Sequence, residues 1–169
     1  MHWIGAIMIV TAGIYAGIIY ISEKRQRLIE LENICGALEM MGGELQTSLS
    51  SLPEVCNALK NRSEGAAKEL FVNLGKSFDR LGETEFSKLW DENVKTVLKM
   101  LSSEEIRQVS ALGKVLGRCE VEHQLESLDG VVLFLRTNLE AARNAYPEER
   151  KLGIGVGAAA ALLLALGLL

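Results

Sequence analysis

The sequence has few of the residues that favour β-structure or long loops. Among its 169 residues only two are proline, and aromatic residues make up 5%. Alternation of β-branched and polar residues, the pattern of a half-buried strand, is nearly absent. These scarcities favour helix throughout, and we therefore predict an all-α protein.

Histidine and cysteine, which carry much of the chemistry of enzymes and metal sites, are also scarce. The two histidines, His2 and His123, do not allow a Ser, His and Asp triad to be assembled. The cysteines, Cys35, Cys56 and Cys119, are an odd number without a C-x-x-C pair. This usage fits a reducing compartment, and we predict that all three thiols belong to the core.

One metal site can still be drawn around the second histidine. Cys119 and His123 are four residues apart, with Glu122 between them. A zinc site needs three or four ligands, whereas this arrangement supplies a single i, i+4 pair. We therefore predict neither a metal site nor a catalytic site.

Charged residues are absent from both ends of the chain. No Lys, Arg, Asp or Glu occurs from Trp3 to Ile21 or from Leu152 to Leu169, runs of 19 and 18 residues. As helices the runs would reach about 27 to 29 Å, close to the roughly 30 Å of a bilayer's hydrocarbon core. We predict transmembrane helices at residues 3–21 and 152–169.

Each run has one alternative interpretation. A cleavable signal peptide would carry a basic segment before the apolar run and a small-residue cleavage site after it, and the first run has neither. A buried core helix would keep a polar face, which the second run lacks around Leu162-Leu163-Leu164. Membrane spanning is favoured for both.

Basic residues flank both runs on the side of the central segment. They are Lys24, Arg25 and Arg27 after the first run, and Arg143, Arg150 and Lys151 before the second. Because Lys and Arg are retained on the cytoplasmic side, residues 22–151 are predicted to form one cytoplasmic domain. Its 18 basic and 22 acidic residues give a net charge of −4, which argues against a nucleic-acid partner.

Apolar spacing within residues 22–151 predicts a bundle of six antiparallel helices between the two spans. The first helix carries a 3-4-3-4 seam of Leu28, Leu31, Cys35, Leu38, Gly42, Leu45, Leu49 and Leu52. The last carries Val121, Leu125, Leu128, Val132, Leu135, Leu139, Ala142 and Tyr146. Four shorter helices are predicted to begin at Ser51, Ser63, Thr84 and Ser102. Gly42-Gly43 predicts either a kink or a stop in the first helix.

Glycines inside the two apolar runs have the spacing of helix-packing positions. Gly13-x-x-x-Gly17 and Gly153-x-x-x-Gly157 place two glycines on one helix face, where they allow close helix approach in lipid. The alternation Gly153-x-Gly155-x-Gly157 does not follow a strand, and no G-K-[ST] motif is present. A nucleotide site is therefore not predicted, and no cofactor is expected.

Two local stretches carry a resemblance to a known family. One is Leu45 to Leu59, in which Leu52-Pro53-Glu54 opens a helix; the other is Leu112-Gly113-x-x-Leu116-Gly117, followed by Glu120 and Gln124. With the order of span, bundle and span, they resemble the stage III sporulation protein AB family of spore-forming bacteria. That family is itself similar to the F-type inner-membrane platform proteins of type II secretion and type IV pilus machines. It more usually has Asp at the position of Glu120.

The resemblance implies a non-enzymatic role in sporulation. The chain would belong to a complex of stage III sporulation membrane proteins in the mother-cell membrane around the forespore, with its bundle facing the cytoplasm. There it would couple a cytoplasmic secretion-type ATPase from the same operon to the membrane complex. Two alternatives stay open: a general secretion or pilus platform subunit, which should have a second bundle and a third span, and a membrane-bound enzyme or metal-binding protein, which needs a polar pocket.

Overall fold

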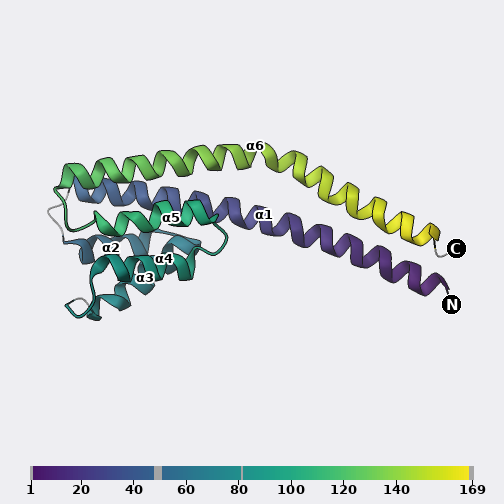
Figure 1. The fold of residues 1–169 in the computed structure, drawn as a ribbon, viewed down its shortest axis with the longest axis horizontal. Coiled ribbons are helices and arrows are strands. Elements are labelled where there is room, and N and C mark those ends of the chain that lie inside the picture. Colours follow the sequence, from purple (N-terminus) through teal and green to yellow (C-terminus); the bar gives the residue numbers. More distant parts are fainter. Residues whose placement is uncertain (1, 48–50, 81, 168–169) are drawn as a thin grey trace. The chain divides into compact units, whose positions relative to one another are not determined.

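The computed structural model describes residues 2–47, 51–80 and 82–167, and within residues 2–10, 13–14 and 148–167 it describes the backbone alone. In these ranges it has six α-helices and no β-strand, which confirms the predicted all-α class (Figure 1). The helices are α1 (His2–Thr47), α2 (Leu52–Arg62), α3 (Gly65–Ser77), α4 (Phe86–Val97), α5 (Ser103–Ala111) and α6 (Val121–Gly167), with 3₁₀ helices η1 (Phe78–Arg80) and η2 (Leu112–Lys114).

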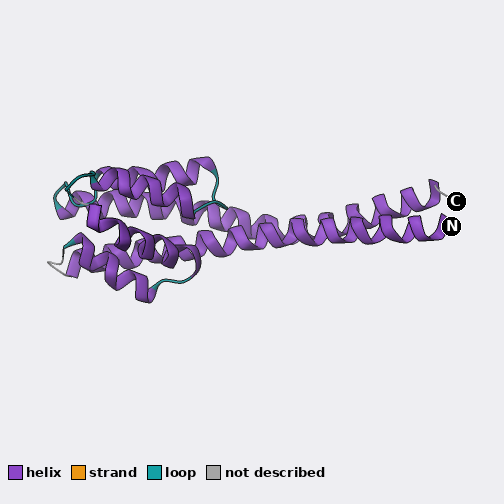
Figure 2. Cartoon of the chain, turned by 90° about the horizontal axis from the view of Figure 1, so that it is seen from below, coloured by secondary structure: helices purple, strands orange, loops and turns teal. Residues whose placement is uncertain are grey.

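Internal contacts divide the chain into two units. One comprises residues 29–139, and the other comprises residues 1–28 and 140–169. The first, which we call the bundle unit, contains α2 to α5 with the adjoining parts of α1 and α6; loops link the shorter helices (Figure 2). The second consists of the remaining segments of α1 and α6.

Large apolar side chains from every helix fill the core of the bundle unit. Trp90 of α4 and Phe71 of α3 are fully buried, and Trp90 Nε1 donates to the Val109 carbonyl at 2.8 Å. Burying an apolar side chain of this kind contributes about 1.5–3 kcal/mol. The widest apolar face belongs to α1 and consists of Leu31, Ile34, Cys35, Ala37, Leu38, Met41 and Leu45.

This face of α1 is broader than the predicted seam, which omitted Ile34, Ala37 and Met41. The difference arises because α1 meets several neighbours at once. Glu44 of α1 pairs with Arg62 of α2, and the Glu30 carboxylate accepts the Met100 N–H at 3.3 Å. A helix packed against several partners buries a wide stripe and not a two-position seam. The helix also continues through Gly42-Gly43 to Thr47, so of the two predicted alternatives, a kink or a stop, the stop does not occur.

In the bundle unit α6 runs antiparallel to α1. Arg136 Nε donates to Glu39 Oε1 at 2.6 Å, and a Cβ added at Gly42 would lie 3.8 Å from Leu125 Cδ2. The residues of α6 buried here are Gln124, Leu128, Val131, Leu135 and Leu139. Val131, and not the predicted Val132, is the buried member of its turn.

Two of the four predicted helix starts are confirmed and two are wrong. At Ser51 and Ser102 the backbone N–H donates to the glutamate three residues later, at 2.8 Å and 2.7 Å. At Ser102 the Glu105 N–H also donates to the serine hydroxyl at 3.3 Å, which completes a capping box. Ser63, however, is the buried residue after α2, and α3 begins at Gly65 with a φ of +53°. Thr84 precedes the N-cap of α4, which is Glu85.

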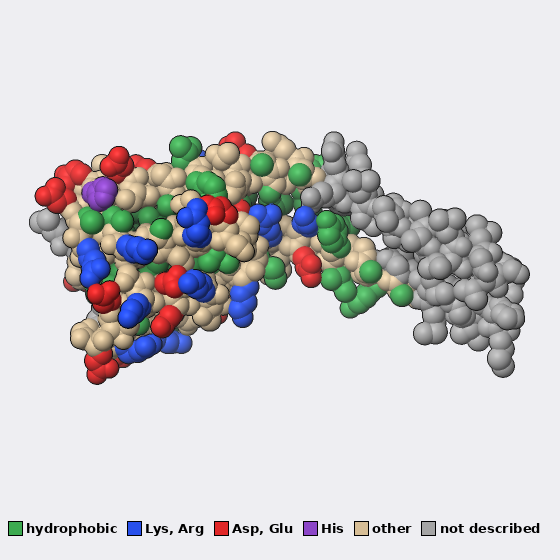
Figure 3. Space-filling view, in the orientation of Figure 1, with side chains coloured by type: hydrophobic (Ala, Val, Ile, Leu, Met, Phe, Trp, Pro, Cys, Tyr) green, Lys and Arg blue, Asp and Glu red, His purple; other side chains and the backbone are tan. Residues whose placement is uncertain are grey.

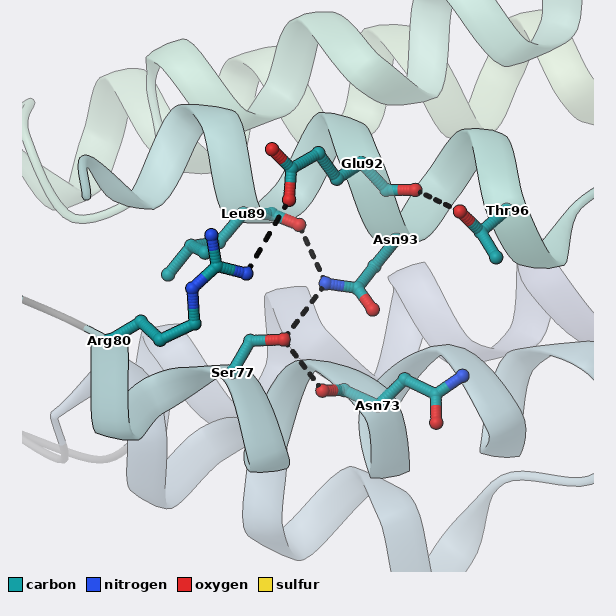
Figure 4. Close-up of polar contacts among 7 residues, drawn as sticks. All are labelled: Asn73, Ser77, Arg80, Leu89, Glu92, Asn93 and Thr96. Carbon is teal, nitrogen blue, oxygen red and sulfur yellow. Dashed lines mark hydrogen bonds and ion pairs between the residues drawn. The ribbon is translucent and has the colours of Figure 1, made fainter.

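A polar network joins α3 to α4 (Figure 4). The Asn93 amide donates to the Leu89 carbonyl at 2.7 Å within α4 and to the Ser77 hydroxyl of α3 at 3.3 Å. Ser77 in turn donates to the Asn73 carbonyl at 2.9 Å. Arg80 and Glu92 add a solvent-exposed ion pair at 3.7 Å. These contacts fix one side of α3 against α4.

The register of α6 generates a stability prediction. Leu135 has no exposed surface, whereas Leu133 is 68% exposed on the same helix. Leu135→Ala should lower the free energy of unfolding by about 2–5 kcal/mol through lost burial and a residual cavity. Leu133→Ala should change it by less than about 0.5 kcal/mol. Chemical denaturation of the purified full-length chain, followed by circular dichroism, measures both; equal losses would contradict the register.

Candidate functional site

The motif Leu52-Pro53-Glu54 forms the first turn of α2. Glu54 caps the helix by accepting the Ser51 N–H, and proline is tolerated here because the first amides of a helix lack intrahelical partners. The side chain of Pro53 is exposed and lines a groove between α2 and α3. The motif therefore starts a helix and also reaches the surface.

The second motif forms the corner that leads from α5 into α6. A Cβ at Gly113 would lie 2.7 Å from Trp90 Cδ1, so only glycine lets this backbone approach the indole. Gly117 has a φ of +73°, the left-handed conformation that favours glycine. The geometry of the corner therefore explains why each of these two motif positions is glycine.

Gln124 holds this corner together. Its buried amide accepts the Gly117 N–H at 3.1 Å and donates to the Cys119 carbonyl at 2.6 Å. Both partners are backbone groups of the loop that leads into α6. Glu120 is exposed immediately before the first residue of α6.

The buried carboxylate of Glu105 was not predicted from the sequence. It has no exposed surface, and it accepts the Ser102 N–H at 2.7 Å and the Asn138 amide of α6 at 3.1 Å. Its neighbour Glu104 is exposed and pairs with Arg107. The capping-box spacing was the available signal for Glu105, but nothing in the sequence indicated the contact with α6.

No metal site was predicted at Cys119, Glu122 and His123, although one can be drawn there. His123 lies 3.7 Å from Glu126 on the exposed side of α6, and Cys119 is partly buried in the preceding loop. Across the part of the chain that the structure describes, no three His, Cys, Asp or Glu residues are placed to share a metal ion.

Most residues of the two predicted spans belong to the ranges whose side chains the structure does not describe. Three of the predicted packing glycines, Gly13, Gly153 and Gly157, lie in those ranges, whereas Gly17 is partly buried within α1. Among the residues whose side chains are described, none of the helices has an apolar stretch sufficient to cross a bilayer. The spans at 3–21 and 152–169 and the packing faces remain predictions.

Among the described residues of the bundle unit are two open grooves with basic linings. One, of about 490 Å³, lies between α2 and α3 and includes Lys60, Lys68 and Lys76. The other, of about 600 Å³, lies between α4 and α5 and includes Lys88, Lys95, Arg107 and Lys114 with Asp91. Acidic side chains instead gather where α6 begins (Figure 3). The fold therefore offers concave surfaces with positive charge in an overall acidic protein.

The fold defines a class: an all-helical bundle with an apolar core. The profile of the family described as stage III sporulation protein AB matches residues 2–169. The chain belongs to the stage III sporulation protein AB family.

A solved structure titled stage III sporulation protein AB has a similar fold. It is 18% identical, its TM-score is 0.63, and the match covers 72% of this chain and 97% of that one. Comparison with curated protein sequences gives no match. The resemblance inferred from the two motifs is thereby confirmed at the level of the family.

Gln124 provides a test of the corner. Gln124→Ala should lower the free energy of unfolding by about 1–3 kcal/mol, because it leaves the Gly117 N–H and Cys119 carbonyl without their partner. Glu126→Ala, an exposed substitution two residues later, should change it by less than about 0.5 kcal/mol. Denaturant unfolding of the two full-length variants measures both free energies. An unchanged free energy of unfolding for Gln124→Ala would show that water replaces the amide.

The three thiols should differ in reactivity. Burial raises the pKa of Cys35 to about 11 and that of Cys56 to about 12, and both side chains are inaccessible. Because the thiolate is the reactive form, iodoacetamide at a pH of about 8 should modify Cys119 first and the other two only after denaturation. Mass spectrometry of the peptides gives the order; early labelling of Cys56 would place it outside the core.

Proposed function

We propose that this chain is a non-enzymatic membrane component of the sporulation complex in the mother-cell membrane around the forespore. Membership of the stage III sporulation protein AB family, over residues 2–169, is the observation that carries this proposal. The match includes both apolar ends as well as the bundle unit, so the family assignment concerns the whole plan of the chain.

Membrane anchoring through residues 3–21 and 152–169 is part of the proposal. Supporting it, the described part of α1 exposes large apolar side chains at Tyr15, Ile18, Ile19 and Tyr20. The Lys24 ammonium lies 5.4 Å from the centre of the Tyr20 ring. Tyrosine and a long basic side chain at the end of an apolar run are typical of a membrane interface. The packing faces Gly13, Gly17, Gly153 and Gly157 would then place the spans against each other or against partners.

Coupling of a cytoplasmic secretion-type ATPase to other stage III sporulation membrane proteins is the proposed task of the bundle. Two features support an interaction role: the basic grooves on the bundle unit, and the mainly apolar core that occupies its interior. The similarity of the family to secretion platforms supplies the class of partner. No cofactor or metal is required for this role.

Deletion of the gene tests the proposed role. Cells lacking it should lose heat-resistant spores, and the full-length gene should restore them. A gene with Val10→Arg should not, because a charge at the centre of the first span costs about 2.5–3.5 kcal/mol of insertion free energy. Ser22→Arg, just outside the span, is the matched control and should restore spores.

Co-purification tests the partner. The full-length tagged chain, extracted from sporulating cells in detergent, should retain the ATPase encoded by the same operon, whereas an unrelated tagged membrane protein should not.

The two experiments separate the two parts of the proposal. Normal spore yield in the deletion strain would overturn the sporulation role. Dependence of sporulation on the gene without ATPase retention would overturn only the coupling.

A further inference from the structure

The groove between α2 and α3 is built from the same helical pattern on both sides. Positions i, i+4, i+7 and i+8 line it from α2, as Pro53, Asn57, Lys60 and Asn61, and from α3, as Lys68, Val72, Gly75 and Lys76. At about 1.5 Å per residue, each lining extends about 12 Å, or slightly more than two helical turns. The groove thus has the length and direction of a short helix segment.

Its floor is apolar and its rim is positively charged. Pro53, Val72 and Phe78 supply the apolar surface above the buried Phe71, while Lys60, Lys68 and Lys76 carry the charge. No carboxylate lines the groove, and among the described residues none of these lysines forms an ion pair. Three uncompensated charges in an acidic chain favour an acidic ligand.

The groove between α4 and α5 is different because much of its charge is already paired. Lys95 lies 2.6 Å from Asp91 and, through this bond, holds the pKa of Asp91 below its usual range. Arg107 pairs with Glu104 beside the groove. An acidic ligand there would compete with carboxylates of the chain itself, so the α2–α3 groove is the stronger candidate.

We infer that the α2–α3 groove binds an amphipathic helix of a protein partner that carries carboxylates about two turns apart beside an apolar stripe. Lys68 and Lys76 are eight residues apart on α3, which matches carboxylates spaced by seven or eight residues on the ligand. The apolar stripe would cover Val72 and Phe78, in the helix-in-groove mode of recognition. The inference rests on the proposed coupling function, because it assigns that function a surface.

A protein helix fits this groove better than a lipid surface or a second copy of the chain. The groove is lined over about two helical turns on both sides and includes the amides of Asn57 and Asn61, which suits the side chains of a helix better than the surface of a bilayer. A second copy brings its acidic residues at the beginning of α6, where the neighbouring Val121 is one exposed apolar residue and not a stripe. Both remain distinguishable outcomes of the experiment.

Photo-crosslinking in sporulating cells tests the assignment on the full-length chain. A photoreactive amino acid replaces Asn57, which is exposed in the groove, or Leu133, which is exposed on α6 and serves as the control site. Mass spectrometry of the crosslinked peptide identifies the bound segment. We expect a crosslink from position 57 to a helix with two acidic residues seven or eight positions apart and an adjacent apolar row, and no such crosslink from position 133.

Matched charge reversals test the chemistry. Lys68→Glu with Lys76→Glu should lower the crosslink yield about tenfold or more, since opposed rim charges become repulsive. Lys88→Glu with Lys114→Glu makes the same change of net charge in the other groove and should leave the yield within about twofold. Gly75→Leu should also lower the crosslink yield, because the new side chain fills the groove, whereas Gly130→Leu on α6 should not. A Cβ at either glycine meets nothing within 4 Å, so both variants should fold.

Several outcomes overturn the inference. Crosslinks from position 57 to lipid, to a second copy of the chain or to a segment without the acidic spacing each contradict it, as does a yield that falls only with the Lys88 and Lys114 reversals. If the gene is needed for spores and no crosslink forms, only this inference fails. If spores form without the gene, the proposed function fails, and the crosslinked segment still tests the groove.

Discussion

The packing of Trp90 against Gly113 is the contact on which the arrangement of the shorter helices depends. The indole is fully buried in α4, its N–H is satisfied by the Val109 carbonyl of α5, and the backbone of η2 lies against its ring. A buried indole must find both an acceptor and a close-fitting surface, which leaves few positions for α5. Once α5 is set, Glu105 is carried into position to meet Asn138 of α6.

Polar groups in this bundle define geometry where apolar packing alone would allow sliding. Apolar helix faces fit one another in several registers at similar free energy, whereas a buried amide or carboxylate has few acceptable partners. Gln124 sets the corner before α6, Glu105 sets α5 against α6, and Asn93 sets α3 against α4. Each lies at the edge of the apolar core and fixes one neighbouring element.

The sequence was informative about local structure and poor on relations between helices. Capping chemistry is local, so the starts at Ser51 and Ser102 were predictable. The predicted start at Ser63 was wrong, because the helix begins at Gly65, whose positive φ no sequence pattern indicates. The choice of Val131 over Val132 depends on where neighbouring helices contact α6. The motif residues could be found through the family resemblance, but the α2–α3 groove could not, because it exists only once two separate helices pack.

The pairing of α1 with α6 has a consequence for synthesis. Glu39 and Arg136 are 97 positions apart, and the side of α1 that faces α6 has no cover until the last part of the bundle unit has left the ribosome. The shorter helices make mostly local contacts and are free to form earlier, whereas closure of the bundle needs its most distant segment. A ribosome stalled between α5 and α6 would therefore hold a partly folded chain with an open apolar face, a substrate for chaperones.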